Sequence, residues 1–477
     1  MAFLIGGANT ESAAYQIDNS VRFNNDDSPF IHKASLGSSS SNAKKWTVSF
    51  WAKLGPGLTA HRCVFSAGEA SGGEYVQINF TDEDKLQIYS SNQFGQADNT
   101  ATAIRTNALY RDVSAWYHVV YAIDFTDGTA GDRIKLYVNG SRVTSFELTN
   151  NIPAQNTDND RIGANNIDHF IGKFTDSSSE YFDGYLAEFH FIDGDAKAST
   201  DFGETNDNGV WVPKKYAGSY GNNGFFLDFR EPNIGNANEE AIGNIGADYS
   251  GNANHFASSG ITTLDQTTDT PTNNFCTWNP LIGRAAAYAT FAEGNLDADF
   301  TSGSVYWRAT GSIGVTSGKW YAEIKCIDDG GNTDLKIGVE HASPDQTTID
   351  GVHKVIQSWN GYKASGGSAA SFGDSYADGD IVGVLLDMDN GTIKFSKNGT
   401  MMASSASAYT DLISAMPESG WAFFAYGYDN ANVQANFGNA PFSISSGNAD
   451  ANGYGNFEYA VPSGYYALCT KNLAEYG

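Results

Sequence analysis

Two pairs of acidic residues have a spacing that invites comparison with a hydrolytic site: Asp183 with Glu188, and Glu323 with Asp328. Hydrolysis of a glycosidic bond needs two carboxyl groups about 5–5.5 Å apart for retention of configuration, or about 6.5–9.5 Å apart for inversion. The members of each pair are five positions apart. This odd number places them on opposite faces of a regular strand. Polysaccharide hydrolysis is therefore an outside alternative.

Other catalytic patterns are weaker. Residues 314–320 have three residues between two glycines where a phosphate-binding loop has four, and Trp320 stands where Ser or Thr must hold magnesium. The eight histidines show no HExxH spacing, and no GxSxG nucleophile elbow is present. We expect no catalytic residues and no enzymatic activity.

Short acidic runs leave calcium open as a cofactor. Residues 387–391 read Asp-Met-Asp-Asn-Gly, which begins like an EF-hand loop but lacks its third ligand and its distant Glu. Comparable oxygen-rich runs lie at 193–195 and 206–208. Such runs are more often solvated turns than ion sites, so we expect neither a metal site nor an obligatory cofactor.

Aromatic residues outside the clearest strands could stack on sugar rings. Trp211, Tyr216 and Tyr220 are the candidate ligand-binding residues, and packing against the preceding domain is their alternative role. The tryptophans inside strand patterns are expected in the core: Trp46, Trp51, Trp116, Trp320 and Trp421. We expect Trp359 and Tyr362 to be buried as well.

The composition narrows the class of protein. The chain has 477 residues, with 28 Lys plus Arg against 55 Asp plus Glu, a net charge of −27. Such a charge disfavours both the phosphate backbone of nucleic acids and anionic membranes as partners. The 63 aromatic residues exclude a disordered chain. No apolar run approaches the ~18 residues of a membrane span, the start lacks the basic region of a secretory signal, and the four dispersed cysteines fit synthesis in a reducing cytoplasm.

The elements that must position these residues are strands. Residues 46–53, 75–80 and 85–89 alternate apolar and polar positions, and residues 134–144 contain Asn139-Gly140, the signature of a two-residue hairpin. No window keeps a helical period. We expect an all-β protein, divided as follows: an N-terminal docking segment (1–20), a first sandwich (21–230), an ordered Asn/Thr/Gly-rich connector (231–284), a second sandwich (285–442) and a tail (443–477).

The first block resembles laminin-G-like, or concanavalin A-like, jelly-roll domains. The resemblance is carried by four segments that occur in the family's order: residues 46–51 (WTVSFW), 116–120 (WYHVV), 135–140 (KLYVNG) and 182–189 (FDGYLAEF). The second block resembles the SPRY (B30.2) domain, another jelly roll. Its matching segments are residues 317–323 (SGKWYAE), 336–339 (KIGV), 378–387 (DGDIVGVLLD), 393–399 (IKFSKNG) and 436–438 (NFG).

This pairing of domains is similar to virion proteins of tailed phages of aquatic bacteria, including cyanophages. Segments shared with that group are residues 201–205, 209–216, 224–229, 248–256 and 462–470. The resemblance implies a non-enzymatic protein assembled in the host cytoplasm and displayed on the virion surface, as a tail fibre, spike or related adhesin that contacts host glycans.

A purely structural role, in capsid decoration or tail bridging, is the alternative, and a polysaccharide depolymerase is the outsider. Expected partners are other virion proteins, host-surface glycans and further copies of this chain. Residues 1–15 are expected to dock on another virion subunit, for example as an added strand.

Overall fold

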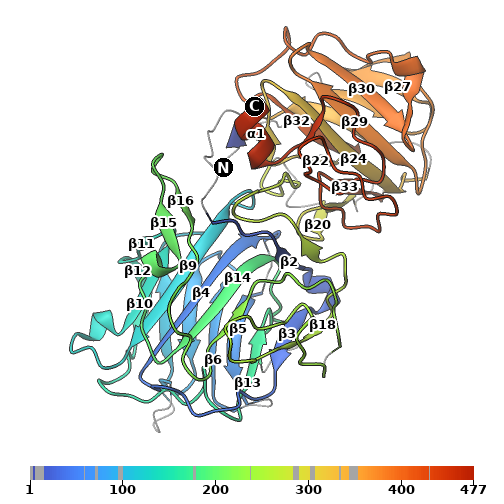
Figure 1. Cartoon of the computed structure of the whole chain (residues 1–477). Helices are drawn as coiled ribbons and strands as arrows, with labels where there is room; N and C mark the ends of the chain where they lie inside the picture. Colours follow the sequence, from blue (N-terminus) through green and yellow to red (C-terminus); the bar gives the residue numbers. More distant parts are fainter. Residues whose placement is uncertain are drawn as a thin grey trace. The chain divides into compact units, whose positions relative to one another are not determined.

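The computed structural model describes residues 4–5, 15–57, 60–69, 73–94, 100–175, 179–236, 238–282, 289–300, 307–331, 335–342, 353–428 and 430–477. These residues fold almost entirely as antiparallel β-structure, which confirms the expected all-β, jelly-roll class (Figure 1). The one α-helix of this part is α1 (Thr470–Tyr476). Short 3₁₀ turns occur at Asn25–Asp27, Ala130–Asp132, Ser199–Asp201 and Met402–Ser405. No helix in the described ranges has the length and apolarity to cross a bilayer.

The chain divides into two compact units. The larger is formed by residues 13–111 and 115–272; the other by residues 1–12, 112–114 and 273–477. Residues 231–272 of the expected connector (231–284) therefore belong to the first unit.

The first unit contains two eight-stranded sheets. The strands of sheet one are, in spatial order, β11 (Ser141–Arg142), β10 (Ile134–Val138), β9 (Trp116–Asp124), β4 (Lys45–Leu54), β14 (Gly184–Asp193), β2 (Ser20–Phe23) and β19 (Gln266–Thr267), with β17 (Phe225–Leu227) paired to β14. Those of sheet two are β12 (Phe146–Asn150), β8 (Thr102–Thr106), β7 (Leu86–Ser90), β6 (Tyr75–Phe80), β5 (Arg62–Gly68), β13 (Asp168–Ile171), β3 (Phe30–Lys33) and β18 (Ala257–Ser259).

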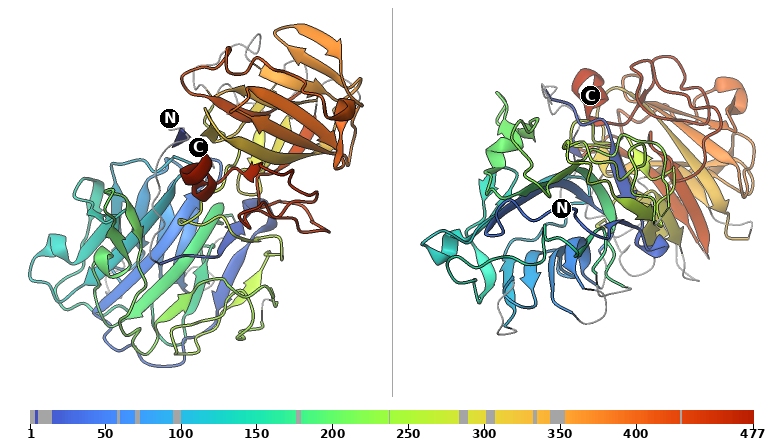
Figure 2. Two further views of the ribbon diagram at one scale, coloured as in Figure 1. Left: turned by 45° about the horizontal axis from the view of Figure 1, so that its top comes forward. Right: turned by 60° about the horizontal axis from the view of Figure 1, so that its bottom comes forward.

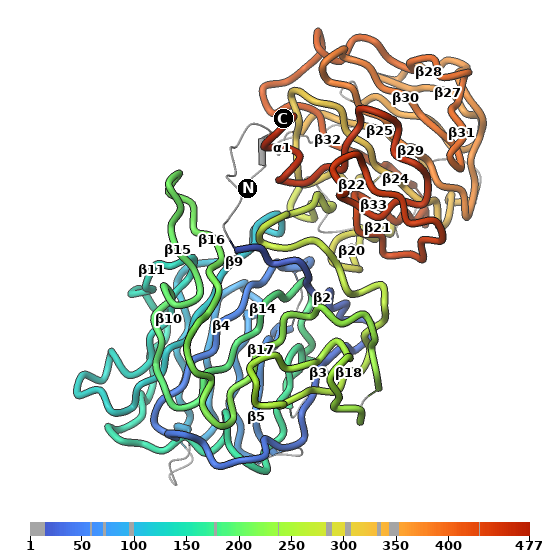
Figure 3. Tube along the Cα trace, viewed as in Figure 1, coloured from blue at the N-terminus to red at the C-terminus, as the bar shows by residue number. Residues whose placement is uncertain are grey.

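Apolar side chains of both sheets form the core of the first sandwich, and stacking of Phe50 on Phe189 at 5.6 Å is an example. The hairpin predicted at Asn139-Gly140 is present, with φ of 46° and 78° at the two positions. Beyond β14 the chain forms a small hairpin, β15 (Gly203–Thr205) with β16 (Trp211–Pro213). It then continues as long coil segments along one side of this sandwich (Figures 2 and 3).

The second unit contains two further sheets. Of the tryptophans expected in the core, Trp46, Trp320 and Trp421 lie in the main cores, whereas Trp51 and Trp116 are buried in a separate cluster on the other face of sheet one. One sheet comprises β20 (Thr290–Ala292), β21 (Asp297–Phe300), β33 (Ala431–Asn436), β24 (Lys319–Asp328), β29 (Ile381–Asp387), β30 (Thr392–Lys397) and β31 (Thr400–Met401), with β34 (Tyr466–Ala467) paired to β24. The other comprises β22 (Trp307–Thr310), β32 (Trp421–Gly427), β25 (Lys336–His341), β26 (His353–Gln357), β27 (Tyr362–Ser365) and β28 (Ser368–Ser371).

The N-terminal segment contributes one described strand. β1 (Leu4–Ile5) pairs in parallel with β23 (Ile313–Gly314) of the same chain. This segment thus acts as an added strand within its own chain. The rest of residues 1–14 lies outside the described residues, and docking on another subunit stays a prediction.

Candidate functional site

Sheet one of the first sandwich is covered on the face that turns away from the sandwich core. Trp51, Trp116 and Tyr185 point to this side and pack with Ile17 and Tyr15, which precede the first strand of the sandwich. Val120 and Ile192 on the same sheet pack with Phe202, Tyr216 and Tyr220. Residues outside the sandwich strands therefore cover this face. The covering layer, called the roof below, contains Tyr15, Ile17, Phe202, Trp211, Tyr216 and Tyr220.

Trp211 is part of this roof. Its indole Nε1 donates a hydrogen bond to Nδ1 of His118 at 3.0 Å, and the two rings stack with centroids 5.9 Å apart. Trp51 stacks on His118 at 4.7 Å. Burial lowers the pKa of His118 to about 3, so the imidazole stays neutral and Nδ1 remains an acceptor.

Tyr216 and Tyr220 lie together in a second part of the roof, with ring centroids 5.1 Å apart. The Tyr216 ring stacks on Phe202 at 4.9 Å, and the Tyr220 hydroxyl lies 2.9 Å from Nδ1 of His190. The structure thus unites two of the three aromatic residues singled out in the sequence and places Trp211 in another cluster. All three rings have protein neighbours, and sugar stacking by them stays a prediction.

A β-bulge in β14 brings Glu188 to this face. Ala187 pairs with Trp51 and His190 with Ser49, so Glu188 and Phe189 together oppose Phe50. Glu188 has a φ of 45°, a left-handed conformation that costs a residue with a Cβ about 1–2 kcal/mol. Bulges redirect side chains and are frequent beside functional sites.

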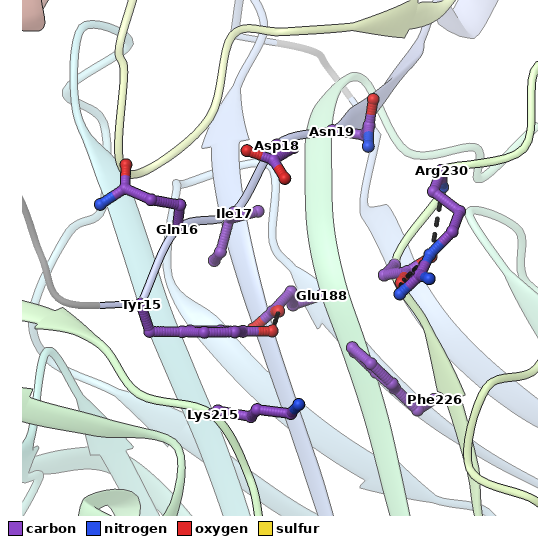
Figure 4. Close-up of a pocket in the computed structure, with 10 residues that line it drawn as sticks. Tyr15, Gln16, Ile17, Asp18, Asn19, Glu188, Lys215, Phe226 and Arg230 are labelled. Carbon is purple, nitrogen blue, oxygen red and sulfur yellow. Dashed lines mark hydrogen bonds and ion pairs between the residues drawn. The ribbon is translucent and has the colours of Figure 1, made fainter.

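The redirected carboxylate lines a cavity of about 360 Å³ in the first unit, here named the Glu188 pocket. Its lining residues are Tyr15, Gln16, Ile17, Asp18, Asn19, Glu188, Lys215, Phe226, Asp228 and Arg230. In the view of Figure 4, Gln16 to Asn19 lie on one side of Glu188, and Lys215 and Phe226 lie on the other. The cavity lies within the usual range for small-ligand sites, about 300–1,000 Å³.

Hydrogen bonds fix Glu188 and Asp228, two of the three acidic groups in the Glu188 pocket. The Tyr15 hydroxyl donates to the Glu188 carboxylate, and Nε2 of His190 lies 3.6 Å from it. Burial, with the nearby Glu188 charge, raises the pKa of Tyr15, so this phenol stays a donor. Asp228 accepts from Arg230 Nε at 2.6 Å.

The pocket offers the groups that recognise a polyhydroxylated ligand. Carboxylate oxygens accept hydroxyl protons, Lys215 and Arg230 donate, and the Phe226 ring supplies an apolar face. Phe226 is held by stacking on His190 at 4.4 Å. This residue set combines segments remote in the sequence, so residue spacing gave no signal for it.

The two carboxylate pairs considered from the sequence do not form a shared site. The expected placement of Asp183 and Glu188 on opposite faces assumed a regular strand, but Asp183 precedes β14 and the bulge at Glu188 and Phe189 interrupts the alternation of this strand. Asp183 is nevertheless outside the pocket lining. Glu323 is buried and accepts from the backbone N–H groups of Glu458 and Tyr459.

The calcium candidates are engaged in turns. Asp193 accepts hydrogen bonds from the backbone N–H of Ser41, Asn222 and Asn223, and Asp387 accepts from Asn390. A different acidic group, Asp328, Asp329 and Asp378, brings carboxylate oxygens within 4.8 Å of one another in the second unit. Exposed acidic groups of this kind are common without an ion.

The expectation that Trp359 and Tyr362 are buried was wrong. Their exposed fractions are 37 % and 38 %. Trp359 lies in the turn that follows β26, and Tyr362 begins β27 near an edge of its sheet. A residue on a strand close to a sheet edge has fewer neighbours than the sequence pattern of an interior strand implies.

Comparison with known families identifies both sandwiches. Residues 31–200 match the model of the concanavalin A-like lectin/glucanases superfamily, and residues 319–439 match that of the SPRY domain. The chain contains both domain types. They suggest a binding role.

Individual relatives are distant. Ran-binding protein 9 of Danio rerio is 28% identical over 139 residues, which cover 28% of this chain and 22% of that protein. Ran-binding protein 10 of the same fish is 27% identical, with the same coverage. The chain thus spans about a fifth of the length of these curated relatives.

Among solved structures, the SPRY domain of human HERC1 is similar at 19% identity and a TM-score of 0.26, covering 29% of this chain and 87% of that one. A heptameric SAP-like pentraxin from Limulus polyphemus is similar at 16% identity and a TM-score of 0.27, covering 39% of this chain and 80% of that one. These values carry no argument about function.

Proposed function

We propose that this chain is a non-enzymatic phage virion protein, displayed on the particle surface, that binds host-surface saccharides in the Glu188 pocket. The observation that carries the binding part is the bulge in β14, which holds a buried carboxylate in a strained conformation and turns it into a polar cavity. Strain of this kind clusters at ligand sites. The virion part is supported by the resemblance of residues 201–205, 209–216 and 248–256 to aquatic phage proteins.

The chemistry of the lining favours a neutral saccharide. Three carboxylates (Asp18, Glu188 and Asp228) face two cations (Lys215 and Arg230), and Arg230 is engaged by Asp228. An anionic ligand would therefore meet repulsion, whereas hydroxyl groups can donate to the carboxylates and a sugar ring can pack on Phe226.

The test is binding of the purified full chain to a glycan array and to host cells. Glu188→Gln and Phe226→Ala should each weaken saccharide binding at least about tenfold, a loss of about 1.4 kcal/mol. Glu204→Gln, which removes an exposed carboxylate on β15, should bind like the wild type. Unchanged binding by both pocket variants would refute this site, and absence of any glycan or cell binding would refute the adhesin role.

The structural alternative is favoured by a specific observation: the roof uses Trp211, Tyr216 and Tyr220 for internal packing. A decoration or bridging protein would leave host adsorption unchanged when it is removed from the particle, and density for the chain in intact virions would locate it. Release of reducing sugar from host polysaccharide by the purified chain would instead establish a depolymerase.

A further inference from the structure

The second sandwich ends, at one edge, in a strand that lacks protection. Among the strands that the structure describes, β28 is the last of its sheet and pairs with β27 alone, and its four residues, Ser-Ala-Ala-Ser, are all exposed. Edge strands present unpaired N–H and C=O groups that accept a further strand, and proteins usually block them with charges, proline or bulges. β28, a strand of four residues, contains no charged residue, no proline and no bulge.

An edge of the first sandwich shows the usual protection. β12 carries a register irregularity between Phe146 and Leu148, and Glu147 between them binds Lys85 Nζ at 2.6 Å. A bulge and a charged pair thus interrupt that edge. This contrast favours a role for the β28 edge in pairing with a further strand.

The hairpin geometry determines which backbone groups of β28 are free. Gly366 and Gly367, with φ of 53° and 78°, form a two-residue turn closed by the pair Ser365–Ser368. Hydrogen-bonded and non-hydrogen-bonded pairs alternate from such a closing pair. The N–H and C=O groups of Ala369 and Ser371 therefore point away from β27.

These groups complement a second copy of the same strand. An antiparallel copy related by a two-fold axis at Ala370 places Ala369 opposite Ser371 of the second copy, and the reverse. The free groups of both strands are then satisfied. The small Ala and Ser side chains allow close approach, and each Ala370 faces its equivalent.

Charge favours this face for self-association. The chain carries a net charge of −27, so two copies repel each other wherever acidic surfaces meet. Residues 362–373 contain no Asp or Glu. The cation among them, Lys363, donates to the Ala408 carbonyl at 2.7 Å.

One exposed aromatic residue lies one strand in from the edge. Tyr362 of β27 pairs with Ser371 of β28, and its exposed fraction is 38 %. Tyr is enriched in protein–protein interfaces, so this ring adds apolar area next to β28.

We propose that two copies of this chain associate by antiparallel pairing of their β28 strands about a two-fold axis at Ala370. This contact is independent of the Glu188 pocket and of the saccharide proposal.

Analytical ultracentrifugation of the full chain at rising concentration tests the proposal. The wild type should form dimers. Ala369→Pro removes an outward N–H without removing a bond to β27 and should weaken dimerisation at least about tenfold. A wild type that stays monomeric throughout would overturn the proposal, as would an Ala369→Pro variant that dimerises like the wild type.

A charge-swap experiment tests the register and does not depend on proline. Ala370→Lys and Ala370→Asp each place like charges opposite each other in a dimer and should each be monomeric. An equimolar mixture should dimerise again, because Lys then faces Asp. Ala451→Lys, the same change at an exposed residue of the tail, is the matched control and should dimerise.

Failure of the mixture to dimerise would overturn the two-fold register at Ala370. Circular dichroism and thermal melting of every variant separate this result from loss of folding.

Discussion

At the scale of single residues, Glu188 is a position where the residue type and the backbone conformation disagree. A non-glycine residue at a φ of 45° in the middle of a ten-residue strand is unfavourable. The surrounding pairings of β14 with β4 on both sides of the bulge hold it there. The strain is thus maintained by the sheet, and its visible result is the direction of one carboxylate.

Because of this strain, we expect glycine to be more stable than alanine at position 188, the reverse of their usual order in a strand. Glu188→Gly should be more stable than Glu188→Ala by about 1 kcal/mol, because glycine adopts positive φ without penalty. At His190, two residues along the same strand, glycine should be the less stable choice by about 0.5–1 kcal/mol. Urea denaturation of the four variants measures both differences, and the same order at both positions would contradict the strain.

At the scale of elements, buried ion pairs fasten coil segments to the sandwich strands. Lys53 in β4 donates to Asp269 at 2.7 Å, and their side chains are 0 % and 2 % exposed. Trp116 in β9 donates to the same carboxylate at 3.2 Å. The segment that follows β19 is therefore tied to two central strands of sheet one.

Removing one partner of this pair leaves a buried charge. Asp269→Ala should lower the free energy of unfolding by about 3–5 kcal/mol. The double variant Lys53→Met with Asp269→Leu should recover most of this loss, since no uncompensated charge remains. Denaturant unfolding checks both values; equal losses in the single and double variants would argue against the pair as the cause.

The tail of the second sandwich is held by a comparable contact. Glu323 accepts hydrogen bonds from Tyr321 Oη at 3.1 Å and from the N–H groups of Glu458 and Tyr459 at 2.9 and 2.8 Å. Burial raises the pKa of Glu323, against which these hydrogen bonds act. One carboxylate thus connects β24 to residues 458–459.

Glu323→Ala should loosen the tail. The N–H groups of Glu458 and Tyr459 would lose their acceptor, which costs at most about 1–3 kcal/mol for each donor because both are only partly buried. We expect faster proteolysis after Lys471 and a lower melting temperature of the second sandwich. Wild-type rates of tryptic cleavage in this variant would show that the tail is held by other contacts.

At the scale of the whole molecule, buried histidines make the first sandwich sensitive to acid. Burial lowers the pKa of His118 to about 3 and that of His169 to about 4, from an ordinary value of 6.5. Between pH 6.5 and these lowered pKa values, the histidines of the unfolded chain are protonated while those of the folded chain stay neutral. Stability is complete above pH 6.5 and falls as the pH decreases toward 3–4.

Thermal melting between pH 7 and pH 4 measures the part of this loss that falls in that range, at most about 3 kcal/mol per histidine. A His169→Asn variant should show a smaller decrease over the same range than the wild type. A wild-type melting temperature independent of pH would contradict the role of the buried histidines.

The sequence by itself determined the class and the modules of this protein. The alternation of apolar residues predicts strands, and Asn139-Gly140 predicts a hairpin turn, from neighbouring residues alone. The burial of Trp46 and Trp421 follows from the size and apolarity of their rings. These signals are local, so they survive without coordinates.

Tertiary structure alone decided the site. The Glu188 pocket joins residues 15–19, one bulged residue of β14 and residues 215–230, which no spacing relates. The bulge follows from pairing on both sides of β14, and the exposure of Tyr362 follows from the position of β27 next to β28, the last strand of its sheet. Which side chain faces a cavity or an edge depends on pairings between distant strands, and a linear pattern does not contain them.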